Sequence, residues 1–139
     1  MKRARVRWVE NLKFVGDAPS GHSILMDGPP ESGGDNVAIR PGEMTLVALG
    51  GCTSIDVVSM LRKMRVDLTD FEVVVDAEPA EDYPKVWTKI HIKYIIKGRN
   101  IEEAKVKRAI ELSEEKYCSV SAMLKGSAEL TYDYEIISD

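Results

Sequence analysis

The chain has 139 residues, which suits one domain able to bury a core without disulfide or metal support. With 44% apolar and 30% charged residues, it is not a disordered protein, and its net charge of -4 argues against a nucleic-acid partner. The basic first residues are followed by no apolar signal region, and polar residues interrupt every apolar stretch before the roughly 18 needed to span a bilayer. We therefore expect a single cytoplasmic domain, residues 1–139, with no membrane partner.

The first third of the chain predicts three short strands, at residues 2–10, 12–15 and 22–26. In the first, basic residues alternate with apolar ones, which is typical of a strand with one solvated face. The same cluster is also compatible with a nucleic-acid stripe, although the acidic balance disfavours that reading. Prolines and glycines in residues 28–36 exclude regular structure and predict a loop.

A long helix is predicted from Pro41, a residue type favoured at the first helical position, to about Met64. Apolar side chains cover most of its circumference, so we expect it to be buried on all sides. Gly50 and Gly51 lie in its middle, where each costs about 1 kcal/mol relative to alanine. The pair predicts close approach of another backbone at the level of Cys52.

The rest of the chain predicts strands at 70–79 and 86–97, an amphipathic helix at 101–116, a short helix at 118–125 and a strand at 128–136. The acidic run at 111–115 is expected to be a solvated helix face. Strands and helices do not alternate regularly, so the pattern indicates an α+β fold with mostly antiparallel pairing.

The two cysteines, Cys52 and Cys118, are the first candidates for chemistry. In a reducing compartment such a pair is either two inert core residues or two functional thiols. Cys118 is expected at a helix start, where unpaired N–H groups stabilise a thiolate and lower its pKa. A redox pair also requires the two sulfurs to meet, which the sequence alone does not show, and both readings stay open.

Glu43 lies nine residues before Cys52, which is two and a half turns and places the side chains on different faces of an ideal helix. One reading is an acidic residue favoured by the helix dipole. The other is a site residue brought round by a first turn that Pro41 and Gly42 distort. No closely spaced Cys or His pairs suggest a metal site, so we expect neither a metal nor a cofactor. Asp56 is expected to be a helix-surface or local hydrogen-bonding group.

Several motifs together resemble those of the OsmC/Ohr family, in its YhfA-like branch. They are Pro41-x-Glu43 followed by Cys52, the triplet Gly50-Gly51-Cys52, and Cys118 in the phrase ELSEEKYCSVSAML after a charged helix. The predicted order of elements also agrees, so the resemblance covers nearly the whole chain.

The resemblance implies an OsmC-like fold that forms an intertwined homodimer, with sheets wrapped around two long central helices. It also implies that Cys52 is the peroxidatic cysteine, Cys118 the resolving cysteine, and Glu43 a residue that helps to hold the catalytic machinery. The implied activity is reduction of organic hydroperoxides in oxidative-stress defence, with a dihydrolipoamide-like dithiol as reductant.

Two differences from the peroxidase branch leave an alternative open. That branch has Cys-Pro-aromatic-Ser at the second cysteine, whereas this chain has Cys118-Ser119-Val120-Ser121. The branch also uses an arginine from an earlier loop to activate the first thiolate, and residues 16–36 contain none. The alternative is a non-enzymatic or weakly active OsmC-like binding or stress protein.

Overall fold

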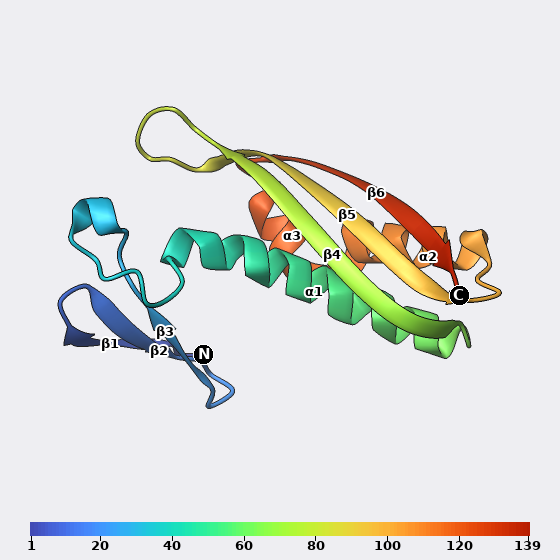
Figure 1. Cartoon of the computed structure of the whole chain (residues 1–139), viewed down its shortest axis with the longest axis horizontal. Coiled ribbons are helices and arrows are strands. Elements are labelled where there is room, and N and C mark those ends of the chain that lie inside the picture. The colour runs from blue at the N-terminus through green and yellow to red at the C-terminus, as the bar shows by residue number, and fades with distance from the viewer. The chain divides into compact units, whose positions relative to one another are not determined.

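The computed structural model describes all residues, 1–139, and confirms the α+β class. The chain forms two compact units, Met1–Thr45 and Leu46–Asp139. The two sheets, β1-β2-β3 and β4-β5-β6, lie one in each unit (Figure 1). Three of the four strand pairings are antiparallel and the fourth, between β5 and β6, is parallel.

The first unit is an antiparallel meander followed by a loop and the first turn of the long helix. Its elements are β1 (Arg5–Glu10), β2 (Lys13–Asp17), β3 (Ser23–Met26) and the short 3-10 turn η1 (Pro30–Ser32). Every residue of β1 is exposed, so the expected buried face of this strand is not formed within the chain. The loop does contain one regular turn, η1, because Pro30 at its first position supplies a suitable φ without needing its missing N–H.

The second unit is a three-stranded sheet with helices packed on one face. Its elements are α1 (Pro41–Lys63, which begins in the first unit), β4 (Asp67–Pro79), β5 (Trp87–Arg99), α2 (Glu103–Leu112), the π-helical turn η2 (Ser113–Tyr117), α3 (Ser119–Leu124) and β6 (Glu129–Ser138). Parallel strands need a crossover connection, and α2, η2 and α3 supply it between β5 and β6. The predicted helix 101–116 is therefore divided, with a π turn at its end.

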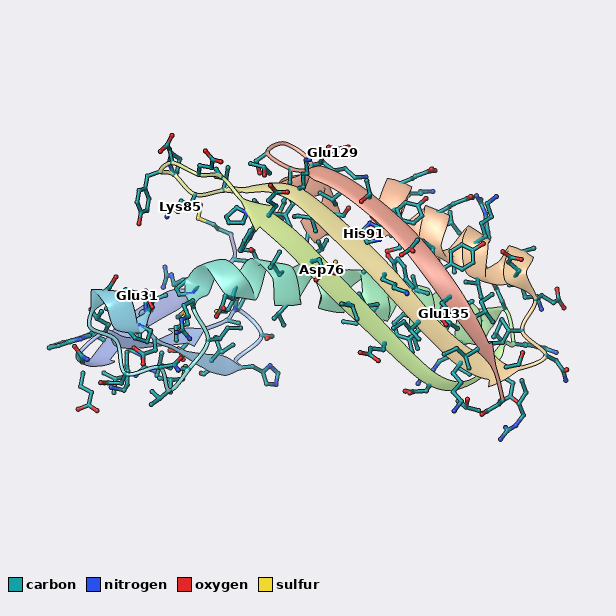
Figure 2. All side chains as sticks on the ribbon, turned by 45° about the horizontal axis from the view of Figure 1, so that its top comes forward. Glu31, Asp76, Lys85, His91, Glu129 and Glu135 are labelled. Carbon is teal, nitrogen blue, oxygen red and sulfur yellow. The ribbon has the colours of Figure 1, made fainter.

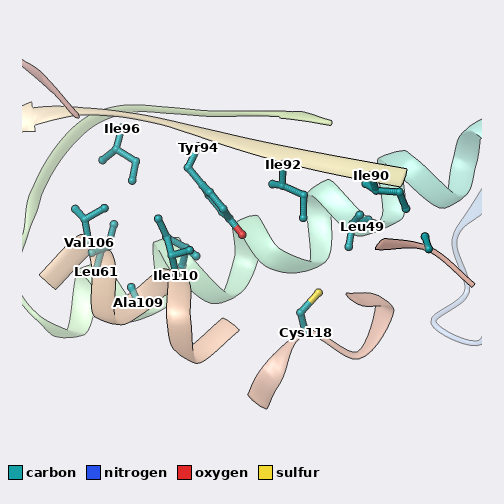
Figure 3. Packing of buried hydrophobic residues seen from close by; sticks show 12 residues of the cluster. Leu49, Leu61, Ile90, Ile92, Tyr94, Ile96, Val106, Ala109, Ile110 and Cys118 are labelled. Carbon is teal, nitrogen blue, oxygen red and sulfur yellow. The ribbon is translucent and has the colours of Figure 1, made fainter. Parts of the chain in front are cut away.

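The core lies between the sheet and the helices. Alternate residues of β5, namely Ile90, Ile92, Tyr94 and Ile96, are fully or almost fully buried, as the alternation in the sequence predicts (Figure 3). They pack with apolar residues of α1 and α2, and such side chains contribute about 1.5–3 kcal/mol each. The opposite face of the sheet is polar: His91 pairs with Asp133, and Lys93 pairs with Glu135. Figure 2 labels Asp76, His91 and Glu135 on this sheet.

The long helix α1 is buried on one face only, which makes the prediction of complete burial wrong within this chain. Leu49, Thr53, Val57 and Leu61, spaced by four residues, face the core. On another face Val47 is 65% exposed and Ile55 is 72% exposed. This apolar face of α1 is therefore not covered by the chain itself.

The two glycines of α1 have different surroundings. A Cβ on Gly50 would lie 3.3 Å from Cγ2 of Val75, so this glycine allows the helix to approach β4 closely. The neighbour there is a side chain and not the backbone that the sequence suggested. A Cβ on Gly51 would meet nothing within 4 Å. Gly50 therefore has a close neighbour within the chain, whereas Gly51 faces open space.

The same helix changes one expectation about membranes. By length and composition α1 is able to cross a bilayer, although the sequence was expected to contain no such segment. Core helices of soluble proteins meet the same criteria. Four residues of α1 pack into the core described above, so its apolar character is accounted for in part by packing.

Candidate active site

The structure brings Cys52 and Cys118 together. Cys52 lies at the midpoint of α1 and is partly exposed, whereas Cys118 precedes α3 and is 4% exposed. Their sulfurs lie within 4.8 Å of each other, and the proximity of Cys52 contributes to the raised pKa of Cys118. Both are free thiols. The first requirement for a redox pair, that the sulfurs meet, is therefore fulfilled.

Cys118 is the N-cap residue of α3. Its sulfur accepts a hydrogen bond from the N–H of Ser121 at 3.4 Å, as expected for a thiol at a helix start. That bond lowers the pKa of Cys118, but burial has the larger effect, and Cys52 and Glu114 raise the pKa further, to about 12. The expectation of a lowered pKa is therefore wrong, because loss of solvent outweighs one N–H donor.

Asp56, expected to be a helix-surface or local hydrogen-bonding group, lies beside the two thiols. It lies four residues after Cys52 on α1, and its carboxylate lies within 4.8 Å of both sulfurs. Oδ2 accepts a hydrogen bond from the hydroxyl of Ser113 at 3.0 Å. The i, i+4 spacing from Cys52 was the signal in the sequence, because such residues share one helix face.

A buried chain of hydroxyl groups connects Asp56 to Glu114. Ser113 is hydrogen-bonded to Thr53 at 2.8 Å, and Thr53 to the hydroxyl of Tyr94 at 2.5 Å. Tyr94 in turn donates to Oε1 of Glu114 at 2.5 Å. The donors come from α1, η2 and β5, so the network links three elements of the unit around the thiols.

Glu114 contradicts the prediction that residues 111–115 form a solvated face, since it is only 5% exposed. Its second carboxylate oxygen accepts from the hydroxyl of Ser121 at 3.2 Å, and its backbone oxygen accepts from Lys125 at 2.7 Å. A π turn adds a residue to the helical repeat, and this turn contains Glu114 and ends just before Cys118. The departure from α-helical geometry is what the sequence pattern could not reveal.

Glu43 lies in the first unit, in the first turn of α1. Its Oε1 accepts a hydrogen bond from the backbone N–H of Arg40 at 3.1 Å. Arg40 immediately precedes the helix and Glu43 is its third residue, which is the geometry of one half of a capping box. The structure thus gives Glu43 a helix-capping contact, and its connection to the thiols stays a prediction.

Within the unit Leu46–Asp139, no lysine or arginine side chain is hydrogen-bonded to either sulfur. Cys52 contacts the thiol of Cys118, and Cys118 contacts Cys52 and the N–H of Ser121. The nearby charged groups are the carboxyl groups of Asp56 and Glu114. No hydrogen bond therefore joins a lysine or arginine of this unit to either thiol.

Comparisons with known proteins agree with the resemblance. A family model described as "OsmC-like protein" matches residues 33–133. Protein YhfA of Escherichia coli K12 is 48% identical over 136 residues, which cover 98% of each chain. Among solved structures, a hypothetical protein from Aquifex aeolicus VF5 is 29% identical and superimposes with a TM-score of 0.86, covering 100% of this chain and 98% of that one.

A more distant solved structure shares the fold alone. It is described as an organic hydroperoxide resistance protein, OsmC, from Legionella pneumophila, with 12% identity, a TM-score of 0.68, and coverage of 97% of this chain and 96% of that one. The family model spans well over half of the chain, and YhfA matches nearly all of it. This chain therefore belongs to the OsmC-like protein family and has its fold.

Proposed function

We propose that this protein is a cytoplasmic thiol-dependent peroxidase that reduces organic hydroperoxides, with residues 1–139 acting as one OsmC-like domain. The observation that supports this best is the contact between the thiols of Cys52 and Cys118. Family membership and the hydroperoxide resistance named for the Legionella neighbour support the substrate class.

The proposed reaction has three balanced steps. The thiolate of Cys52 attacks the O–O bond of the hydroperoxide, which releases an alcohol after protonation and leaves a sulfenic acid. The thiol of Cys118 then displaces water from that sulfenic acid and forms a disulfide. A dithiol of the dihydrolipoamide kind reduces the disulfide and becomes oxidised itself.

The different environments of the two thiols support this assignment of roles. Cys52 is partly exposed, so a substrate can reach it, whereas Cys118 is buried. Contact with Cys52 contributes to the raised pKa of Cys118. A buried thiol with a raised pKa is the poorer nucleophile toward a peroxide, so Cys118 is proposed to react after Cys52.

Glu43 is proposed to help hold the catalytic machinery, through its place at the start of the helix that carries Cys52. The protein is also proposed to act as a homodimer. The apolar face of α1 around Val47, Gly51 and Ile55, which nothing in the chain covers, supports a second copy as its partner. Helix-to-helix contact at Gly51 would account for the second glycine.

The test is consumption of cumene hydroperoxide with dihydrolipoamide as reductant, run beside hydrogen peroxide. Cys52→Ser should abolish turnover. Cys118→Ser should accumulate a sulfenic acid on Cys52 that dimedone traps. Thr88→Ala, an exposed position on β5, should retain the wild-type rate. Full activity in Cys52→Ser would overturn the assignment.

One observation favours a second candidate, a non-enzymatic or weakly active OsmC-like stress protein. No cation contacts either sulfur within the unit Leu46–Asp139, and two carboxyl groups lie close to them. Negative charge disfavours a thiolate. Turnover no faster than that of free cysteine, at equal thiol concentration, would support this candidate over the peroxidase.

A further inference from the structure

Three side chains that are able to bind a metal converge on one point of the unit Leu46–Asp139. The sulfurs of Cys52 and Cys118 and a carboxylate oxygen of Asp56 all lie within 4.8 Å of one another. In tetrahedral zinc sites, with Zn–S bonds of about 2.3 Å, two sulfur ligands lie about 3.8 Å apart. The ligand atoms are therefore already near the spacing that a single Zn²⁺ requires.

We propose that the reduced protein binds one Zn²⁺ ion through Cys52, Asp56 and Cys118, with the fourth position left to water or a small ligand. Each thiol releases its proton as its sulfur binds the metal. Thiolate and carboxylate ligands suit a borderline-soft cation and do not suit Mg²⁺ or Ca²⁺, which prefer oxygen alone. Three protein ligands and one open position are typical of zinc sites that exchange a ligand.

The elements that carry the ligands hold them in place. Cys52 and Asp56 are four residues apart on α1, so both project from one face of a regular helix. Cys118 caps α3, and the N–H of Ser121 binds its sulfur at 3.4 Å. Such N–H···S contacts orient a thiolate without blocking its other lone pairs. The site therefore depends on two helices and not on a loose loop.

The groups behind Asp56 are those expected around a ligand. Oδ2 accepts from the buried hydroxyl of Ser113, which Thr53 binds in turn, so the carboxylate has a fixed orientation. Hydrogen bonds of this kind strengthen metal binding, and their removal typically costs about 10–100-fold in affinity. No hydrogen bond engages Oδ1, so it is available to a metal.

A route for entry also exists. A cavity of about 380 Å³ is open beside α1 and η2, with Asp56 and Tyr117 in its wall. Asp56 therefore lines this solvent-accessible cavity and also lies within 4.8 Å of the two sulfurs. A hydrated ion can reach the carboxylate first and then exchange its water for the thiols.

Metal binding and disulfide formation exclude each other, because both use the same two sulfurs. Zinc would keep the pair reduced and prevent formation of a sulfenic acid on Cys52, while oxidation would release the ion. This proposal does not depend on the proposed peroxidase activity, since it concerns the reduced thiols alone.

The test measures Zn²⁺ affinity of the full-length, reduced protein by competition with a chromophoric chelator. Wild type should bind one ion per chain. Asp56→Asn, which keeps the shape and the acceptor for Ser113, should weaken binding at least tenfold. Cys52→Ser and Cys118→Ser should weaken it more, and Asp76→Asn, the same charge change on the exposed face of β4, should have no effect.

A second measurement identifies the ligands directly. Co²⁺ in place of Zn²⁺ should give a thiolate-to-cobalt charge-transfer absorption, which Cys52→Ser and Cys118→Ser should each reduce. Oxidation to the disulfide should abolish it. Zinc binding that is unchanged in all three ligand variants, or that depends on the cysteines and not on Asp56, would overturn the three-ligand site.

Discussion

The hydroxyl of Tyr94 donates a hydrogen bond to Oε1 of Glu114 at 2.5 Å. The Tyr94 side chain points from β5 toward the helices (Figure 3). Burial raises the pKa of Tyr94 above its ordinary value, and Glu114 raises it further, so this hydroxyl stays a donor. The bond fixes the buried carboxylate of Glu114 four residues before Cys118. A strand and a helical turn are thus joined at the level of the thiol pair.

Tyr94→Phe should lower the free energy of unfolding by about 1–3 kcal/mol, because Glu114 and Thr53 both lose a buried partner. Urea denaturation measures the change. The matched control is Tyr134→Phe, which removes an exposed hydroxyl that donates to Glu103 at 2.7 Å and should cost under about 0.5 kcal/mol. Equal losses in the two variants would contradict a special role for the buried network.

Stability should fall in alkaline solution because of Cys118. Its pKa is raised from about 8.5 in the unfolded chain to about 12 in the folded one. Between these values the unfolded chain binds fewer protons, so the free energy of unfolding decreases by at most about 1.4 kcal/mol per pH unit. This contribution is complete below about pH 8.5 and is lost as pH rises toward 12.

The measurement is urea denaturation of the reduced protein at several pH values, compared with Cys118→Ala. The variant lacks the titrating thiol, so its stability should decline less steeply above about pH 8.5. Identical slopes for the two proteins would show that Cys118 is not the group responsible.

Iodoacetamide should alkylate Cys52 before Cys118 under native, reducing conditions. Cys52 is partly exposed, whereas Cys118 is buried and its pKa is raised. Mass spectrometry of peptides over time follows both sites. Cys118 should react at a comparable rate only after unfolding in urea. Faster native labelling of Cys118 would reverse the proposed roles of the two thiols.

Glu43→Gln separates the capping contact of Glu43 from its proposed part in catalysis. An amide oxygen still accepts from the N–H of Arg40, so the unfolding free energy should change by less than about 0.5 kcal/mol. Loss of the charge should nevertheless slow hydroperoxide turnover. Glu43→Ala should slow hydroperoxide turnover as well. It should also lower the free energy of unfolding by about 0.5–2 kcal/mol, because the capping hydrogen bond is lost. A wild-type rate in Glu43→Gln would leave Glu43 as a helix cap only.

Val47→Glu should convert the proposed homodimer to a monomer. Val47 is exposed on the uncovered apolar face of α1, so a charge there costs little in one chain but is unfavourable when a second copy covers it. Light scattering coupled to size exclusion gives the mass. Val74→Glu, on β4 and partly exposed, serves as the control and should leave the mass unchanged. A monomeric wild type would contradict the dimer.

The elements themselves were largely predictable from the sequence. Alternation in 86–97 predicted the buried side of β5, and Pro41 marked the start of α1. The prediction that α1 is buried on all sides was wrong for the single chain. The sequence of an apolar helix does not indicate whether the residues that pack against it come from its own chain or from another. Parallel pairing of β5 with β6 was also missed, since periodicity gives no strand direction.

The site was predictable in part. The structure places the sulfurs of Cys52 and Cys118 within 4.8 Å of each other, whereas in the sequence only a resemblance, and not their spacing, connected them. The partner of Asp56 could not be predicted, because Ser113 comes from a segment fifty-seven residues away. Glu114 was misjudged because the π turn shifts it inward, out of the solvated face that α-helical periodicity predicts.

The crossover that carries Cys118 also sets an order of events during synthesis. Cys52 is made sixty-six residues before Cys118, and the core around both needs β5 and the crossover helices. At about 5–20 residues per second, Cys52 leaves the ribosome roughly 3–13 s before Cys118 leaves it. Through that interval Cys52 is a lone thiol that cannot form a disulfide with Cys118, so the proposed resolving step is open to it only after the crossover has been made.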